Sequence, residues 1–439
     1  MSQIKNETSP INIFWFRRDL RLTDNHGLYR ALRSDLPVLP LFIFDRNILD
    51  QLHDRQDRRV DFIHQILSEI HTRLARHNSS LLVLYGEPLQ VWQQLLNQFK
   101  IHTVFINHDY EPYAIKRDEK IKHLLSARGI NFASYKDQVI FEKNEIMKQD
   151  QKPYSIYTPY RLAWQKLLRA ENVQPYPSER FLNKLFKNNP AIFPDLAAIG
   201  FASSGFNFPS RQIQKSIIIN YTRMKDFPSR NGTTRLGVHL RFGTVSIRKL
   251  IRLALELNET WLSELIWREF FMMILYHFPQ VVQQPFKNKF NMIPWRNNQE
   301  EFERWCTGQT GYPLVDAGMR ELNQTGFMHN RVRMVTASFL TKHLLIDWRR
   351  GEHYFAVKLL DYDLASNNGN WQWVAGCGCD AVPYFRIFNP VTQQKKFDSD
   401  ETYIKKWIAE LDSASYPKPI VDHTFAYQRA QSALSQSQF

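Results

Sequence analysis

Cysteine is scarce in this sequence, and the common cysteine motifs are missing. Only Cys306, Cys377 and Cys379 occur among the 439 residues, and none of them forms a CxxC pair. A disulfide framework and a structural zinc site are therefore not expected, and we predict no metal site. Cys377 and Cys379 lie on either side of one glycine, and we interpret them as small core or pocket residues rather than as metal ligands.

Long apolar runs are also missing. No run of about 18 apolar residues occurs, so we expect no membrane span. The first ten residues, MSQIKNETSP, are polar and lack the apolar segment of a secretion signal. These features favour a cytoplasmic protein, nucleoid-associated if bacterial, and leave an organellar or nuclear address open.

Acidic residues are outnumbered by basic ones. The chain has 57 Lys and Arg against 43 Asp and Glu, which gives a net charge of +14. From residue 205 to the end the counts are 29 and 21, so the excess extends through the chain and is not confined to a tail. A basic excess favours polyanionic partners, because phosphate neutralisation releases counterions. Many basic proteins bind no nucleic acid, so the charge alone leaves this open.

The first 135 residues alternate between strand-length apolar runs and helical patterns. The runs cover residues 11–16, 38–44, 81–85 and 103–106, and helical spacing of apolar residues covers 57–75, 89–99 and 113–128. This alternation predicts an α/β domain over residues 1–135, with a Rossmann-like parallel sheet covered by helices on both faces. The segment after the first run is RRDLRLTDN, without the GxGxxG fingerprint, so we do not predict a nicotinamide site.

The rest of the chain divides into a connector and a helical domain. Prolines recur in residues 136–204, which predicts a connector with short helices between two domains. Residues 205–439 are expected to form an all-α domain, with helices at 246–257, 260–277, 316–322, 328–345 and 352–359. Eight of the eleven tryptophans lie in this part, and the polar tail from Ser413 is expected to be partly frayed.

An unusual mixture of side chains occurs in residues 360–380, LDYDLASNNGNWQWVAGCGCD. Carboxylates, amides and two tryptophans stand close together there. A core segment rarely carries so many polar groups, and a solvated loop rarely carries two tryptophans. The segment therefore predicts the wall of a pocket for a large planar ligand.

Two helical segments and one loop could add to such a site. Glu264, Trp267 and Arg268 share one helix face, although a surface pair between Glu264 and Arg268 explains the spacing equally well. Asn330, Arg333 and Met334 also share a face, which a solvated basic helix would explain as well. In residues 231–237, NGTTRLG, backbone and hydroxyl donors could bind a diphosphate, but an ordinary helix N-cap is the simpler interpretation.

Several long motifs resemble those of the cryptochrome/photolyase family. Within this family, the resemblance is closest to the class I cyclobutane pyrimidine dimer photolyases. The motifs are FWFRRDLRLTDNHGL (14–28), TGYPLVDAGMREL (310–322), MHNRVRM (328–334), DYDLASNNGNWQW (361–373) and AVPYFRIFNP (381–390). The resemblance, which runs from residue 14 to about 407, implies an N-terminal α/β domain and a C-terminal all-α domain that binds FAD.

The resemblance also implies the residues that bind FAD. They are Tyr221, Thr233, Thr234, Arg235, Leu236, Gly237, Trp261, Arg268, Asn330, Arg333, Asp361, Asp363 and Asn367. Gly237 stands where the family usually has a serine, so one hydroxyl contact is missing or is replaced by a backbone N–H. Asn367 is expected to face the reactive nitrogen of the flavin, where a neutral amide suits the reduced anionic form better than a carboxylate.

Four further positions match the residues that contact the DNA lesion in the class I enzymes. Glu264 matches the residue that hydrogen-bonds the dimer, Trp267 and Trp373 match its aromatic wedge, and Met334 matches its methionine contact. The matching DNA-backbone residues are Arg268, Arg331, Arg386 and Gln393, together with Lys225, where the family usually has arginine. Lysine keeps the charge but lacks the bidentate fork of arginine.

The implied activity is light-dependent repair of pyrimidine dimers in UV-damaged DNA by electron transfer from excited reduced FAD. Trp371, Trp348 and Trp295 match the family's electron-transfer chain, which would re-reduce the cofactor. Ala114 stands where folate-binding members have a glutamate, so a folate antenna is not expected, and a deazaflavin, a second flavin or an empty antenna site stay open. We expect a monomer. The alternative is a cryptochrome-like blue-light photoreceptor that signals through a protein partner.

Overall fold

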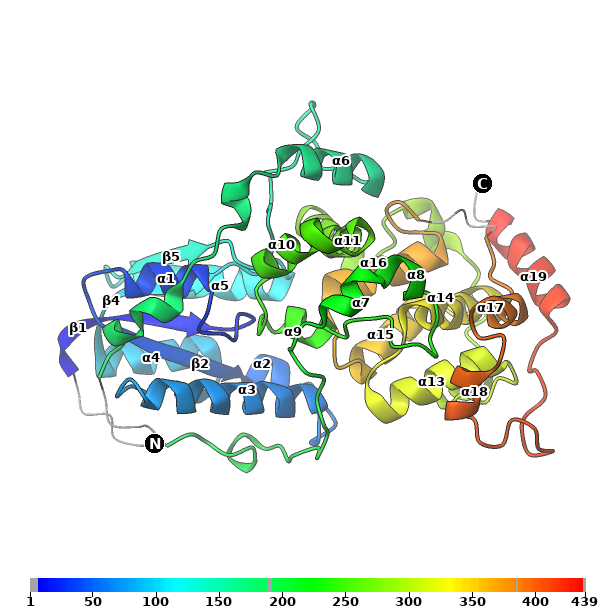
Figure 1. The fold of residues 1–439 in the computed structure, drawn as a ribbon, viewed down its shortest axis with the longest axis horizontal. Helices are drawn as coiled ribbons and strands as arrows, with labels where there is room; N and C mark the ends of the chain where they lie inside the picture. Colours follow the sequence, from blue (N-terminus) through cyan, green and yellow to red (C-terminus); the bar gives the residue numbers. More distant parts are fainter. Residues whose placement is uncertain (1–6, 188–191, 382, 384–385, 437–439) are drawn as a thin grey trace. The chain divides into compact units, whose positions relative to one another are not determined.

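A five-stranded parallel sheet organises the N-terminal part of the computed structural model, which describes residues 7–187, 192–381, 383 and 386–436. The strand order is β3-β2-β1-β4-β5, and Figure 1 labels β1, β2, β4 and β5. The strands are β1 (Glu7–Phe16), β2 (Val38–Asp45), β3 (Leu82–Gly86), β4 (Phe99–Asn107) and β5 (Asn131–Tyr135). In the central strand β1, Phe14 lies opposite Pro40 of β2 and Phe105 of β4. This order, with β1 in the middle, confirms the predicted Rossmann-like sheet.

Helices pack on both faces of this sheet. Ile13 and Trp15 of β1 share a core with residues of α4 (Pro88–Gln98) and α5 (Pro112–Ser126). Phe14 points to the other face, where a Cβ on Gly27 of α1 (His26–Leu32) would lie 2.9 Å from its ring. The right-handed crossover from β2 to β3 places α3 (Arg58–Ala75) on the α1 face as well. Every residue of β2 is buried, as expected for a strand covered on both sides.

Two elements of this part were not predicted. The helix α1 is only seven residues long, too short for a helical period to be distinct. The strand β5 reads NFASY and is half-exposed at the edge of the sheet, so it has no continuous apolar run. A short helix, α2 (Arg46–Leu49), follows β2.

The chain forms two compact units whose segments alternate along the sequence. The first comprises Met1–Glu142, Leu168–Gln212 and Leu236–Leu253, and the second comprises Lys143–Leu167, Ile213–Arg235 and Ala254–Phe439. Residues 136–204, expected to be a connector, are thus shared between the units. They include α6 (Tyr157–Leu167) and three 3₁₀ helices, Ala170–Val173, Ser178–Lys184 and Ala197–Ile199. The division into domains at residues 135 and 205 stays a prediction.

The remainder of the chain is almost entirely helical, as expected from the sequence. Its longer helices are α10 (Ile247–Leu257), α11 (Glu259–His277), α12 (Gln299–Thr307), α13 (Pro313–Thr325), α14 (Asn330–Ser338), α15 (Trp348–Lys358), α16 (Leu364–Ala375), α17 (Pro390–Phe397) and α19 (His423–Gln436). Short helices are α7 (Lys215–Ile219), α8 (Tyr221–Met224), α9 (Gly237–Arg241), α18 (Thr402–Trp407) and two 3₁₀ turns, Pro279–Val282 and Asn288–Met292. None of the helices in the described part combines the length and apolar character needed to cross a membrane.

One expectation for this helical part was wrong. Residues 328–345 do not form one α-helix, because α14 ends at Ser338 and continues as a π-helix over Phe339–His343. The tail, which was expected to be partly frayed, contains a regular element. Within it, α19 forms a helix that buries Ala426 and Ala430.

The helix α16 is central to the second unit (Figure 1). It packs against α11, α14 and α15. Asp363 begins it by accepting a hydrogen bond from the backbone N–H of Ser366 at 3.0 Å, and Gly376 ends it in the left-handed conformation with φ of 87°. The mixed stretch at residues 360–380 is therefore a capped helix whose polar and aromatic side chains face different neighbours.

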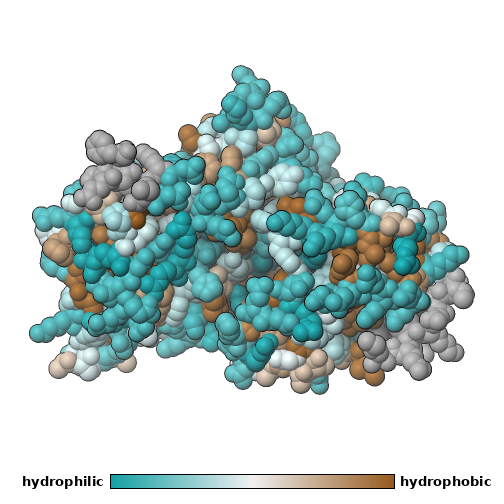
Figure 2. Space-filling view, turned by 180° about the vertical axis from the view of Figure 1, so that it is seen from behind, coloured by the Kyte–Doolittle hydropathy of each residue, from teal (hydrophilic) through white to brown (hydrophobic). Residues whose placement is uncertain are grey.

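Exposed hydrophobic side chains occur in several parts of the chain. Leu162, Ile192 and Phe425 are examples. Hydrophilic side chains predominate on the face shown in Figure 2. Scattered apolar residues of this kind are usual on folded chains and indicate no particular partner.

Candidate functional site

A cavity lies between α14, α15 and α16 of the second unit, and its empty volume of about 570 Å³ includes space that is open to solvent. It joins polar groups from the loop before α16 with apolar walls from the three helices. Its lining residues are Asn330, Arg333, Met334, Ala337, Phe355, Leu359, Asp361, Tyr362, Asp363, Ser366, Asn367, Asn370, Trp371 and Val374. Five of the residues expected to bind FAD are among them: Asn330, Arg333, Asp361, Asp363 and Asn367.

An ion pair fixes one side of the cavity. The Arg333 guanidinium donates through one nitrogen to both carboxylate oxygens of Asp361, at 3.0 and 3.1 Å. Its Nε donates to the backbone oxygen of Met328 at 2.7 Å, which orients the guanidinium plane. The expected shared face of Asn330, Arg333 and Met334 is therefore real, and it lines a cavity instead of facing bulk solvent.

An amide–carboxyl pair lies on another side. Asn367 Nδ2 donates to Glu352 Oε1 at 2.8 Å and to the Glu352 backbone oxygen at 3.1 Å. Burial raises the pKa of Glu352, and the hydrogen bond from Asn367 opposes this rise. Since both contacts use the amide nitrogen of Asn367, they set the orientation of its side chain. Glu352 was not expected from the sequence, because it stands 15 residues from Asn367 and outside every motif.

The composition of this cavity fits a flavin. The walls contributed by Ala337, Phe355 and Val374 are apolar, as the faces of a fused ring require. Carboxylate, amide, hydroxyl and guanidinium groups surround them, and these can hydrogen-bond the polar edge of such a ring and the hydroxyls of a ribityl chain. Arg333, Asp361, Asp363 and Asn367 are the groups that would hold it.

Most of the other residues expected to contact FAD stand at residues 221–237, outside the lining of this cavity. Tyr221 begins α8, and Thr233 and Thr234 are half-buried in the loop that follows. Arg235 has a positive φ of 51°, and its guanidinium lies 4.6 Å from the ring centre of Phe327. Leu236 is buried, and Gly237 is the first residue of α9. Two more, Trp261 and Arg268, stand on α11, buried and half-buried respectively. Their contacts with FAD stay predictions.

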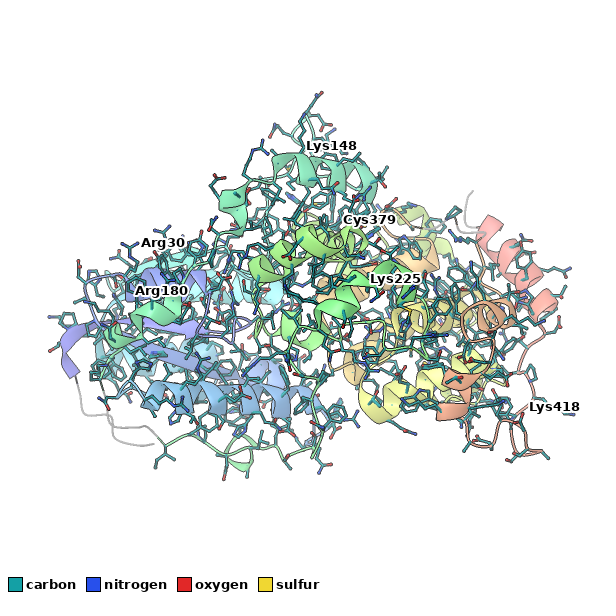
Figure 3. All side chains as sticks on the ribbon, in the orientation of Figure 1. Arg30, Lys148, Arg180, Lys225, Cys379 and Lys418 are labelled. Carbon is teal, nitrogen blue, oxygen red and sulfur yellow. The ribbon has the colours of Figure 1, made fainter. Side chains whose placement is uncertain are left out.

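The helix α11 carries the acid and the indole expected to contact the lesion. The Glu264 carboxylate accepts a hydrogen bond from Lys225 Nζ at 2.9 Å, a different partner from the surface pair with Arg268 considered above. The Trp267 ring stacks on Tyr157 of α6, with ring centres 3.6 Å apart and planes 10° apart. Lys225, labelled in Figure 3, directly follows α8.

The other two residues expected at the lesion lie on neighbouring helices. Met334 of α14 lines the cavity. Trp373 of α16 is half-buried and packs against the same hydrophobic core, but it is not among the lining residues. The structure therefore joins Met334 directly with the FAD candidates and leaves the role of Trp373 a prediction.

The three tryptophans of the expected electron-transfer chain belong to one hydrophobic core. Trp371 and Trp348 are buried in it, and Trp295 packs against it half-exposed. A further tryptophan packs against this group. Trp305 of α12 is fully buried, lies edge-on to Trp371 with ring centres 6.2 Å apart, and donates from Nε1 to the Thr336 oxygen at 3.1 Å. Only its place in the fold distinguishes it from an ordinary core tryptophan.

The residues expected to contact the DNA backbone differ in their surroundings. The Arg331 guanidinium pairs with Asp226 at 2.8 Å, as Lys225 does with Glu264. Arg386 is exposed, and Gln393 of α17 is half-buried with no hydrogen-bond partner for its Oε1 in the described part of the chain. These contacts with DNA also stay predictions.

The three cysteines are buried, and burial raises the pKa of each thiol to about 12. Neutral thiols of this kind are inert packing groups. Cys379, labelled in Figure 3, follows the end of α16.

Comparison with known proteins decides the family. The family model described as DNA photolyase matches residues 12–179, and the FAD binding domain of DNA photolyase matches residues 261–415. A curated relative from Synechococcus, named deoxyribodipyrimidine photo-lyase, is 37% identical over 98% of this chain and 97% of its own. The chain belongs to the DNA photolyase family. The expected enzyme class and FAD-binding domain are thereby confirmed.

Solved photolyase structures share the whole fold. A class III photolyase from Agrobacterium tumefaciens is 30% identical and has a TM-score of 0.86, and the alignment covers 100% of this chain and 100% of that one. A photolyase from Sulfolobus tokodaii, solved with two FAD molecules, is 34% identical with a TM-score of 0.84, over 98% of this chain and 100% of that one. The α/β part and the helical part of this photolyase-family chain therefore follow a known architecture.

Proposed function

We propose that this chain is a class I photolyase that repairs cyclobutane pyrimidine dimers in UV-damaged DNA under blue or near-UV light. The observation that carries the proposal is the cavity of the second unit. It holds five expected FAD contacts together with Met334, the residue matched to a lesion contact. The relative from Synechococcus, named deoxyribodipyrimidine photo-lyase, supports the same activity.

The cavity residues position the cofactor in this proposal. When bound, reduced FAD would supply, after excitation, the electron that opens the cyclobutane ring. Arg333 and Asp361 are held rigid by their mutual ion pair, so they can orient the polar edge of the ring without reorganising. Asn367 presents a neutral amide there, which avoids the repulsion that a carboxylate would create with an anionic ring.

The lesion would be held by α11. A pyrimidine dimer stacks poorly, so flipping it out of the duplex costs only a few kcal/mol. Trp267 would stack on the extruded bases, and Tyr157 stacks on the Trp267 ring. Glu264 would hydrogen-bond the dimer carbonyls and stabilise the charge that develops on them.

Electron supply and light harvesting would use other parts of the chain. Trp371, Trp348 and Trp295 would carry electrons from the surface to the cavity when the cofactor is oxidised. In the first unit, Ala114 is buried in the first turn of α5, in the place of the folate-binding glutamate. We therefore propose that any second chromophore here is not a folate.

The test is illumination of the purified, FAD-reduced protein with an oligonucleotide that contains one thymine dimer. Loss of dimers in the light and not in the dark is the expected result. Glu264→Ala should lower the repair yield while FAD remains bound. Intact, reduced FAD without any repair would contradict the proposal and would favour a photoreceptor.

A further inference from the structure

Two of the cations expected to bind DNA phosphates are paired with carboxylates of the same chain. Lys225 Nζ lies 2.9 Å from Glu264 Oε1, and the two side chains are 30% and 36% exposed. Arg331 lies 2.8 Å from Asp226, the residue next to Lys225. Positive and negative groups therefore neutralise each other at this surface before any DNA is present.

Tyr221 completes the group around Glu264. Burial raises the pKa of its hydroxyl, and the nearby charges of Glu264 and Asp226 raise it further, so the phenol stays neutral beside the carboxylate. Lys225 Nζ also lies 5.7 Å from the centre of the Tyr221 ring. The Lys225 ammonium therefore has two possible partners in the protein, the Glu264 carboxylate and the Tyr221 ring. The flexible lysine side chain can move between them.

The ion pair conflicts with the role proposed for Glu264. An ionised carboxylate only accepts hydrogen bonds, whereas a dimer carbonyl needs a donor. Half-exposed ion pairs are weak, so a DNA phosphate can compete for the ammonium. When the ammonium moves to a phosphate, Glu264 loses a cation and gains a nearby anion, and both changes favour its protonated form.

We propose that Lys225 is a specificity-determining residue that positions Glu264, and this proposal rests on the proposed function. A DNA phosphate displaces Glu264 from the Lys225 ammonium, and Glu264 then takes up one proton from solvent and donates it in a hydrogen bond to the lesion. The charges balance, because Lys225 stays protonated and the phosphate stays ionised. Undamaged DNA offers no lesion carbonyl to the protonated acid, so only damaged DNA completes the exchange.

Two measurements test the exchange with the FAD-containing protein and dimer-containing DNA. The first is the salt dependence of binding, because each phosphate contact contributes about one to the slope of log K against log salt. Lys225→Gln should reduce the slope by about one, whereas Lys225→Arg should leave it unchanged. Lys418, exposed and labelled in Figure 3, offers the matched control, and Lys418→Gln should not change the slope.

The second measurement is proton uptake on binding, by calorimetry in two buffers of different ionisation enthalpy. Damaged DNA should cause uptake of about one proton by the unmodified protein, and undamaged DNA much less. Glu264→Gln should abolish the difference. An unchanged salt slope in Lys225→Gln, or no uptake that depends on Glu264, would overturn the exchange.

Repair under light is measured on the same preparation. Absent repair contradicts the proposed function, whereas normal repair without proton uptake contradicts only the role of Lys225. The FAD content and the circular dichroism spectrum of each variant show whether it has folded. If Lys225→Gln does not fold, proton uptake by Lys225→Arg decides whether the exchange takes place.

Discussion

Tyr157 and Trp267 stack face to face, with ring centres 3.6 Å apart. The Tyr157 hydroxyl is anchored at Ser263, donating to its backbone oxygen at 2.7 Å. Ser263 precedes Glu264 on α11, so one tyrosine braces both the indole and the turn of helix that carries the acid. Burial raises the pKa of Tyr157 to about 12, and the phenol therefore stays neutral and able to donate.

Removal of this brace should weaken lesion binding. Stacked aromatic pairs contribute about 0.5–1.5 kcal/mol beyond simple burial, so Tyr157→Leu should weaken binding of dimer-containing DNA by roughly two- to twelvefold. Tyr157→Phe keeps the ring and loses only the hydroxyl, so it should bind almost normally. Fluorescence anisotropy with a labelled oligonucleotide measures both. Equal affinities for the two variants would contradict a role for the stack.

Much of the fold could be predicted because its signals are local. The buried strand β2 has a continuous apolar run, and α3 buries Val60, Leu67 and Leu74 along one face. Apolar runs and helical spacings of this kind can be recognised directly in the sequence. The strand β5 and the tail helix α19 have weak periods of their own and are stabilised by neighbours, which no local pattern reports.

The site was predictable only in part, for a related reason. Motif residues such as Arg333, Asp361 and Asn367 do meet in one cavity. The partners of the motif residues could not be predicted from the sequence. Glu352, which binds Asn367, and Tyr157, which stacks on Trp267, lie outside the motifs and reach them only through the packing of the fold. The contact between Glu264 and Lys225 could not be found either, because the two residues stand 39 positions apart in the sequence.

A methyl group at Gly351 should disturb Trp371. A Cβ built on Gly351 would lie 2.2 Å from the Trp371 ring and 2.5 Å from Leu340, so one of them must move. Overpacking of this kind costs about 1–3 kcal/mol. We expect Gly351→Ala to lower the free energy of unfolding by that amount and to slow light-driven reduction of FAD. Val357→Ala, at an exposed position of the same helix, is the control and should change neither quantity.

Glu352 should make stability depend on pH. Burial raises its pKa above the ordinary value of 4.5, so the folded chain binds more protons than the unfolded chain above pH 4.5. Its contribution is therefore complete below that value and is lost as the pH rises through the folded-state pKa. Glu352→Gln removes this titration, so the stability of the variant relative to the unmodified protein should increase from pH 4.5 to pH 7 in urea unfolding. A constant difference would contradict the raised pKa.

The tail helix α19 is attached through a contact between two histidines. His343 Nε2 lies 2.9 Å from His423 Nδ1, and one ring must donate to the other. The His343 backbone oxygen also accepts a hydrogen bond from Arg429 at 2.5 Å. Burial, together with the charges of His423 and Arg429, lowers the pKa of His343 from 6.5 to about 3.

Acid should therefore release α19 before the rest of the fold. A lowered pKa means that the unfolded segment binds protons first, so stability is full above pH 6.5 and is lost as the pH falls toward 3. Hydrogen exchange over His423–Gln436 should be faster at pH 5 than at pH 7.5, after correction for intrinsic rates. Because His343 already stacks on Phe339, His343→Phe should keep the packing and remove this acceleration. His102→Gln, exposed in β4, should retain it, and equal acceleration in both variants would exclude His343 as the cause.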